Sequence, residues 1–204
     1  ALAWGELTEP QTATTIVVDG ANVVGSRPDG WWSDRLGAAR ALRDQLRHMV
    51  RMGLSPADEH MPPTPLHVLF PRVILVVEGG AAPLAQERPV EEPGEKPLFK
   101  PSYTIRGPRI APWWERSIEV EAPDPARSGD DEVVARVAEA QANGEHIIVV
   151  TADRELRERA SAVAPGVRHA GPSWLLGLID AAAAREQAPG SAGEGAPPPA
   201  RPGA

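Results

Sequence analysis

Short runs of consecutive hydrophobic residues alternate along the chain with longer stretches in which hydrophobic residues recur every three or four positions. The short runs, rich in Val and Ile, predict buried strands at residues 14–19, 73–79, 117–122, 146–150 and 167–170. The longer stretches predict helices at 33–52, where Ser33 or Asp34 is the cap, at 130–142, at 153–163 and from 172 onward. This alternation indicates an α/β fold: a three-layer sandwich around a central, mainly parallel sheet of about five strands.

The hydrophobic faces of three of these helices identify candidate core residues. They are Leu36, Leu42, Leu46, Met49 and Val50 on the first helix, Val133, Val134 and Val137 on the second, and Trp174, Leu175, Leu178 and Ile179 on the last.

The chain is expected to form one domain over residues 14–184, because 204 residues with 42% hydrophobic content suffice for a single core. Residues 1–13 form a polar lead-in, and 53–72 are a proline-rich connection without periodicity. Residues 81–116 are proline-rich and charged, show no clear helix and are interpreted as an insertion. Residues 185–204 are dominated by Pro, Gly and Ala and are predicted to be a disordered tail.

Acidic residues follow the predicted strands at the points where those strands end. Asp19 comes directly after one hydrophobic run, Asp153 follows another, and Asp130 and Asp131 open the helix between them. The carboxyl ends of parallel strands meet in one crevice, so these carboxylates are expected to converge there. They would repel one another unless a divalent cation held them, and hard cations such as Mg²⁺ or Mn²⁺ take oxygen ligands. The pattern therefore predicts a metal site formed by Asp19, Asp130, Asp131 and Asp153.

Other interpretations of the two adjacent aspartates remain open. The segment 128–131 is also a good helix N-terminus, in which a carboxylate serves as a cap. Two neighbouring aspartates exceed what a cap needs, which favours metal binding for Asp130. Asp131 points in a different direction on the helix, so capping and metal binding are equally compatible with it.

Polar residues beside these carboxylates are candidates for supporting roles. Asn22 could hold a water, a phosphate oxygen or Asp19, or could form a turn, which asparagine favours. Glu78 ends the second strand and is either a further metal ligand or a solvated strand end. Thr151 could orient Asp153 or a metal-bound water, although a β-branched residue at the end of a strand needs no special role.

Trp31 and Trp32 lie in the sequence beside Arg27 and Arg35. Such a group could stack a base and hold phosphate, as in proteins that bind single strands, whereas large aromatic residues are more often part of the core. Arg154, next to Asp153, is a further candidate for substrate binding. The arginines at 40, 43, 47 and 51 repeat along one helix face and are interpreted as a solvated surface.

Composition restricts the possible functions. The chain has no cysteine, which excludes disulfides, thiolate metal sites and cysteine nucleophiles. A formal net charge of -7 argues against a general nucleic-acid coat but not against a nuclease, because part of the excess lies in the predicted metal site. No hydrophobic run approaches the roughly 20 residues that span a bilayer, and no signal-peptide pattern opens the chain, so a cytoplasmic location without membrane contact is expected.

Four segments, taken together in order and spacing, resemble the NYN family of PIN-like ribonucleases. They are VVDGANVV at 17–24, GDDEVV at 129–134, VVTADREL at 149–156 and GPSWLL at 171–176, and the likeness extends over most of 14–80 and 117–182. The resemblance implies a PIN-like sandwich and a Mg²⁺- or Mn²⁺-dependent cleavage of RNA phosphodiesters. The implied catalytic residues are Asp19, Asn22, Asp130, Asp131 and Asp153, and Arg27, Arg35, Thr151 and Arg154 would contact RNA.

Two alternatives belong to other functional classes. A PIN-like module that binds RNA or a protein, with weak catalysis, would keep the same fold, although the apparently complete acidic set favours an enzyme. A phosphoacceptor receiver domain also gathers aspartates at strand ends, but it needs a lysine after a late strand. No lysine follows Lys100, which argues against the receiver domain. The oligomeric state is not predicted by the sequence.

Overall fold

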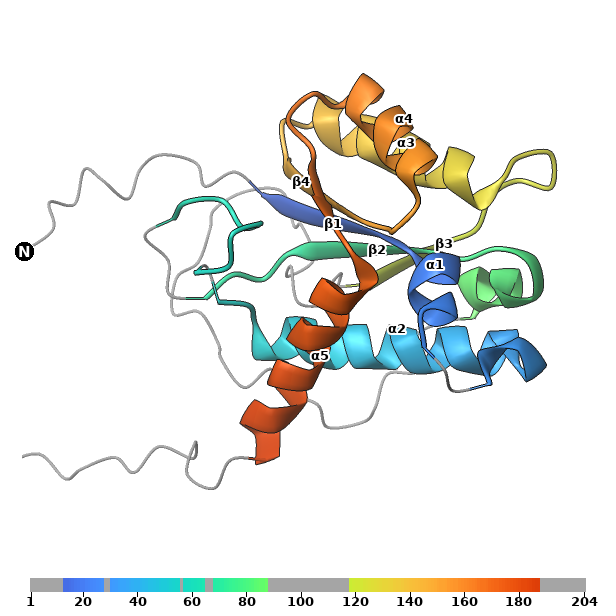
Figure 1. Cartoon of the computed structure of the whole chain (residues 1–204), viewed down its shortest axis with the longest axis horizontal. Coiled ribbons are helices and arrows are strands. Elements are labelled where there is room, and N and C mark those ends of the chain that lie inside the picture. Colours follow the sequence, from blue (N-terminus) through green and yellow to red (C-terminus); the bar gives the residue numbers. More distant parts are fainter. Residues whose placement is uncertain (1–12, 28–29, 56, 65–67, 88–117, 188–204) are drawn as a thin grey trace, which may run out of the picture.

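A computed structural model describes residues 13–27, 30–55, 57–64, 68–87 and 118–187 (Figure 1). Their strands form one five-stranded sheet in the order β3-β2-β1-β4-β5, in which every neighbouring pair is parallel. The strands are β1 (Thr14–Asp19), β2 (Arg72–Val76), β3 (Ile118–Glu121), β4 (His146–Val150) and β5 (Arg168–Ala170). The predicted α/β/α sandwich is confirmed.

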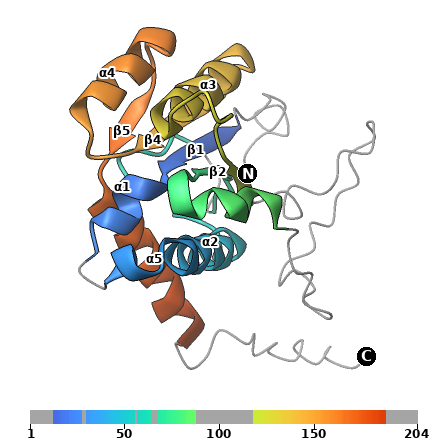
Figure 2. The same cartoon turned by 90° about the vertical axis from the view of Figure 1, so that its right-hand side faces the viewer.

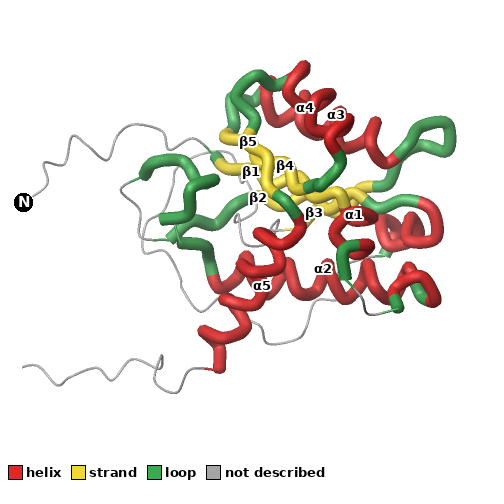
Figure 3. Tube along the Cα trace, viewed as in Figure 1, coloured by secondary structure: helices red, strands yellow, loops and turns green. Residues whose placement is uncertain are grey.

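Helices cover both faces of this sheet. Figures 1 and 3 show α3 and α4 above it and α2 and α5 below it. The helices are α1 (Gly20–Gly25), α2 (Arg35–Met52), α3 (Gly129–Ala142), α4 (Arg154–Val163) and α5 (Pro172–Gln187), with the 3₁₀ helices η2 (Trp31–Ser33) and η3 (Gly79–Gln86). No helix among the described residues is long and apolar enough to cross a membrane.

Alternate residues of the strands form two separate cores. Val17, Ile74 and Val149 pack with α3 and α4 on one face, while Ile16, Val18 and neighbouring residues of β2 and β4 pack with α2 and α5 on the other. The period of two in side-chain direction explains why consecutive residues of a strand are all buried. Every predicted core residue contributes to one of these cores. Leu36, Val134, Trp174 and Leu178 are partly buried, and the remaining eight are buried.

The strand order reverses at β1, so the crevice predicted from the sequence corresponds to the carboxyl ends of β1 and β4. The chain passes outward from β1 to β2 and β3 and then returns to β4 on the other side of β1. Such a reversal leaves an opening between the two central strands, where α/β proteins bind ligands. Val18 is in register with Val150, so Asp19 and Thr151 extend from the sheet side by side. Figure 2 views the molecule from this end, with α1 and η3 in front.

The larger differences from the sequence-based expectations concern two helices, one strand and the start of the tail. Residues 20–25 form α1 and 80–86 belong to η3, although no helix was expected at either place. The strand expected over 73–79 runs from Arg72 to Val76. Residues 185–187 continue α5, so the expected start of a disordered tail at 185 is wrong. The lead-in at 1–12, most of the proposed insertion (88–116) and the tail at 188–204 lie outside the described residues.

Candidate active site

Asp19 lies where the strand order reverses, as the last residue of β1 and the N-cap of α1. Its Oδ1 accepts a hydrogen bond from the backbone N–H of Asn22 over 3.1 Å, and its Oδ2 accepts one from the Thr151 hydroxyl over 2.9 Å. Burial raises the pKa of Asp19, and the charges of Glu78 and Asp153 raise it further, while the two hydrogen bonds oppose the shift. Asp19 therefore lies in a partly desolvated, negatively charged environment.

Thr151 connects Asp19 with Asp153. The Thr151 hydroxyl, fully buried, donates to Asp19 and accepts a hydrogen bond from the backbone N–H of Asp153 over 3.1 Å. Asp153 in turn caps α4, because its Oδ1 accepts from the backbone N–H of Leu156 over 3.0 Å. The single hydroxyl thus connects the Asp19 carboxylate at the end of β1 with the backbone of Asp153 in the segment after β4.

The Asn22 side chain also links α1, which follows β1, to the segment after β4. Its Oδ1 accepts a hydrogen bond from the backbone N–H of Ala152 over 2.8 Å. The guanidinium of Arg157 donates to the carbonyl of Thr151 over 2.9 Å and holds this segment from the side of α4. Asn22 is thus a structural clamp in this geometry, a role that the sequence interpretation did not consider. Arg157 was not singled out at all, because its partner is a backbone carbonyl.

Asp130 lies in the first turn of α3, where the charges of Asp19, Asp153 and Glu78 act on it. These four carboxylates are called the acidic group below. Burial raises its pKa, and the charges of Asp19 and Asp153 add to the shift, whereas Arg159 lowers it. Arg159 Nη1 lies 3.9 Å from Asp130 Oδ2, and neither carboxylate oxygen of Asp130 accepts a hydrogen bond from the described residues. Asp130 therefore lies close enough to Asp19 and Asp153 for their charges to act on it, and a shared metal site stays a prediction.

Glu78 holds the N-terminus of α3 beside the end of β2. Its Oε2 accepts a hydrogen bond from the backbone N–H of Gly129 over 2.9 Å. A Cβ at position 129 would lie 2.6 Å from that oxygen, so the close approach depends on glycine. Glu78 also contributes negative charge to both Asp19 and Asp130. Glu78 is exposed, as a solvated strand end would be, and its role as a metal ligand stays a prediction.

Asp131 is turned away from this group. Its Oδ2 accepts from the backbone N–H of Ser128 over 3.0 Å, while the Ser128 hydroxyl accepts from the N–H of Asp131 over 3.1 Å, which is a capping box. Arg159 Nη2 donates to Asp131 Oδ1 over 2.5 Å. These contacts, led by the hydrogen bond from Ser128, lower the pKa of Asp131 to about 2. The observed role is helix capping, and the catalytic role of Asp131 stays a prediction.

The candidate substrate-binding arginines lie outside the acidic group. Arg27 donates to Gln45 Oε1 over 2.9 Å, and Arg35 lies over the ring of Trp31, 5.6 Å from its centroid. Arg154 pairs with Glu158 over 3.0 Å, and its side chain is 93% exposed. Arg159, which approaches both Asp130 and Asp131, was missed in the sequence analysis because no motif marks it.

The acidic residues do not form a complete metal shell as they stand. Within the described ranges, no three Asp, Glu or His side chains are arranged so that they could hold one metal ion. The donor set is nevertheless that of a hard cation, since it consists of carboxylate oxygens. Both oxygens of Asp130 and Oδ2 of Asp153 accept no hydrogen bond from the described residues, and these are the atoms free to act as ligands.

Comparisons with known proteins support the fold. No protein-family model matches the chain, and no curated protein matches it. Among solved structures, a tryptophan-to-leucine mutant of Rae1 (YacP) from Bacillus subtilis has a TM-score of 0.51 at 13% identity, over 84% of this chain and 77% of that chain. A second structure of Rae1 has a TM-score of 0.49 at 16% identity, over 85% and 77%. The first likeness supports the fold, a parallel five-stranded sheet between layers of helices.

Proposed function

We propose that residues 14–184 form a divalent-metal-dependent ribonuclease that hydrolyses RNA phosphodiester bonds in the crevice between β1 and β4. The observation that carries the proposal is the electrostatic coupling of Asp19, Asp130 and Asp153. The pKa values of Asp19 and Asp130 are both raised by burial and by neighbouring carboxylates. A fold gains nothing in stability from gathering like charges in a partly buried place, whereas a bound Mg²⁺ or Mn²⁺ would make the arrangement favourable.

The available oxygens define which residues would hold the ion. Asp130 and Asp153 have carboxylate oxygens that accept no hydrogen bond from the described residues, and they would be ligands together with Asp19. Glu78 would contribute negative charge from the edge of the group. When bound, a divalent ion lowers the pKa of a coordinated water and neutralises charge that develops on the phosphate.

The protein's own residues would perform three further tasks. Thr151 and Asn22 would keep Asp19 and the loop after β4 in fixed relative positions through their 2.9 and 2.8 Å hydrogen bonds. The bond from Gly129 to Glu78 would hold α3 so that Asp130 faces the crevice. Arg159 would place a positive charge near the reacting phosphate. Such preorganisation removes the cost of rearranging charged groups during the reaction.

A second candidate function is an RNA- or protein-binding module with weak catalysis. It is favoured by the hydrogen bonds that Asp19 accepts at both oxygens and by the capping role of Asp153. Carboxylates engaged in this way compete with a metal for their own lone pairs. For both candidate functions we propose the cytoplasmic location that the sequence predicts.

Cleavage assays distinguish the two candidates. Purified protein is incubated with unstructured RNA, structured RNA and single-stranded DNA in Mg²⁺, Mn²⁺ or EDTA. Asp19→Asn is the test variant, and Asp180→Asn, which removes an exposed carboxylate on α5, is the matched control. RNA cleavage that requires metal, is lost in the Asp19 variant and is kept in the control is expected. Cleavage that survives EDTA or the Asp19 substitution contradicts the ribonuclease proposal.

A further inference from the structure

Trp32 is the most exposed large hydrophobic residue of the described chain, with 66% of its surface open to solvent. It lies in η2, directly before α2. Its ring meets that of Trp31 edge to face, with centroids 6.3 Å apart and an interplanar angle of 79°. Trp31 is partly buried and packs against the core of the sheet. Trp31 therefore anchors the pair, and Trp32 presents its aromatic surface to solvent.

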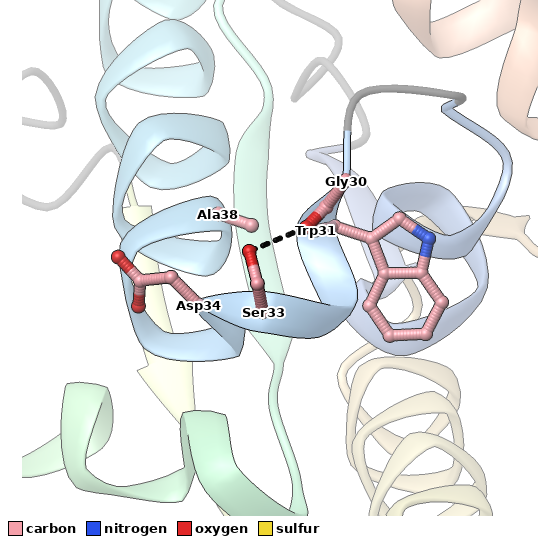
Figure 4. A pocket seen from close by; sticks show the side chains of 5 residues that line it. All are labelled: Gly30, Trp31, Ser33, Asp34 and Ala38. Carbon is pink, nitrogen blue, oxygen red and sulfur yellow. Dashed lines mark hydrogen bonds between the residues drawn. The ribbon is translucent and has the colours of Figure 1, made fainter.

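Local backbone structure holds this pair in place. Gly30 precedes Trp31 with a φ of 79°, a left-handed conformation that favours glycine. The hydroxyl of Ser33 donates to the carbonyl of Gly30 over 2.9 Å, and Asp34 caps α2 through the N–H of Gly37 over 2.8 Å. Figure 4 shows the shallow hollow lined by Gly30, Trp31, Ser33, Asp34 and Ala38, in which Asp34 points away from the Trp31 ring. The aromatic pair thus stands on a preorganised turn.

The aromatic pair lies beside the two segments that lead out of the acidic crevice. The Trp31 ring adjoins Gly25, the end of α1, where an added Cβ would be 3.7 Å from Cζ2. Since α1 begins directly after Asp19 and rises about 1.5 Å per residue, the backbone of Gly25 is roughly 9 Å along the helix axis from that of Asp19. The exposed Arg35 lies against Gly80, two residues after Glu78.

We propose that Trp32, with Trp31 and Arg35, forms a base-stacking subsite for an unpaired nucleotide at the mouth of the crevice. Aromatic faces bind bases of any sequence by stacking, and a nearby arginine adds an attraction for phosphate. The 5.6 Å distance from the Arg35 guanidinium to the Trp31 ring centroid places this cation next to the stacking surface. The identity of the ligand as RNA rests on the proposed function, whereas stacking requires no cleavage.

Binding of a labelled, single-stranded oligoadenylate tests the subsite. Fluorescence anisotropy is recorded in EDTA and again in Ca²⁺, with the probe checked for integrity afterwards. Trp32→Ala is expected to weaken binding about 5- to 150-fold in both conditions, the range for loss of one stacked base. Trp32→Phe should retain most of the affinity. Val163→Ala, which shortens an exposed hydrophobic side chain on α4, is the control and should bind as the wild type does.

Two further measurements separate stacking from a structural effect. The oligoadenylate paired with oligouridylate should bind more weakly than the single strand and should be insensitive to Trp32→Ala, because its bases are already stacked in the duplex. Quenching of tryptophan fluorescence by the single strand should decrease in Trp32→Ala at an unchanged melting temperature. Equal affinity of Trp32→Ala and the wild type, or no binding of the single strand by the wild type in either condition, overturns the subsite. Binding that depends on Trp32, found together with no RNA cleavage, supports the base-stacking subsite and contradicts the proposed ribonuclease function.

Discussion

The buried hydroxyl of Thr151 donates a hydrogen bond to Asp19 Oδ2 over 2.9 Å and joins the carboxyl ends of β4 and β1. The same hydroxyl accepts from the N–H of Asp153 over 3.1 Å. One side chain thus couples the two carboxylates that the proposed mechanism places on a common metal. The position of Asp153 therefore depends on Thr151, although Thr151 carries no charge.

Thr151→Val should impair both stability and activity. The substitution keeps the shape of the side chain but leaves Asp19 Oδ2 without its donor and the N–H of Asp153 without its acceptor, at a cost of about 1 to 3 kcal/mol in the free energy of unfolding. Thr151→Ser keeps the hydroxyl and is the matched control. Urea unfolding and RNA cleavage rates measure the two effects. A Val variant that equals the wild type in both would remove the positioning role of Thr151.

Asp130→Asn and Asp131→Asn should change stability in opposite directions in EDTA. The pKa of Asp130 is raised above its ordinary value of 3.8, so the native state binds more protons than the unfolded state in the interval above 3.8. The free energy of unfolding therefore decreases as pH rises through that interval and stays lower at neutral pH. Asn at position 130 removes this penalty, and the variant should melt at the same or a higher temperature than the wild type near neutral pH.

The pKa of Asp131 is lowered from 3.8 to about 2, so its stabilising contribution is fully present above 3.8 and is lost as pH falls through about 2. Asp131→Asn should consequently lower the melting temperature near neutral pH. Both differences should shrink as pH decreases. Melting curves over a pH series give the comparison. Equal changes in melting temperature for the two variants would contradict the different environments of Asp130 and Asp131.

Gly129 and Glu78 should be energetically coupled. Gly129→Ala places a Cβ 2.6 Å from Glu78 Oε2, so the carboxylate must move and its hydrogen bond to the N–H of residue 129 is weakened. In a Glu78→Ala background this conflict is absent, and alanine in the helix should stabilise the protein by about 0.4 to 1 kcal/mol. A double-mutant cycle by urea unfolding measures the coupling. Additive effects would mean that this contact has no energetic consequence.

The strand ends could be predicted from sequence because Asp19 directly follows one continuous hydrophobic run and Asp153 comes shortly after another. The helix α1 could not be predicted, since its six residues are too short for a hydrophobic period to be visible. The separate roles of Asp130 and Asp131 depend on the direction of each side chain and on Arg159, 28 residues beyond Asp131.

Long-range contacts set the rest of the site. Glu78 reaches Gly129 across 51 positions, and the amide of Asn22 reaches the N–H of Ala152 across 130. No local pattern encodes these pairings, because they result from the strand order, which brings β4 beside β1 and places the start of α3 next to the end of β2.

The dependence of melting temperature on Mn²⁺, measured for the wild type and for Asp130→Asn, tests the central claim of a divalent-metal site most directly. A ligand that binds only the native state stabilises it by an amount that grows with its concentration over Kd, about 2.7 kcal/mol at a hundredfold excess. We expect Mn²⁺ to raise the melting temperature of the wild type well above that of Asp130→Asn, although the variant melts at the same or a higher temperature in EDTA. A wild type whose melting temperature is unaffected by Mn²⁺ would contradict the metal site.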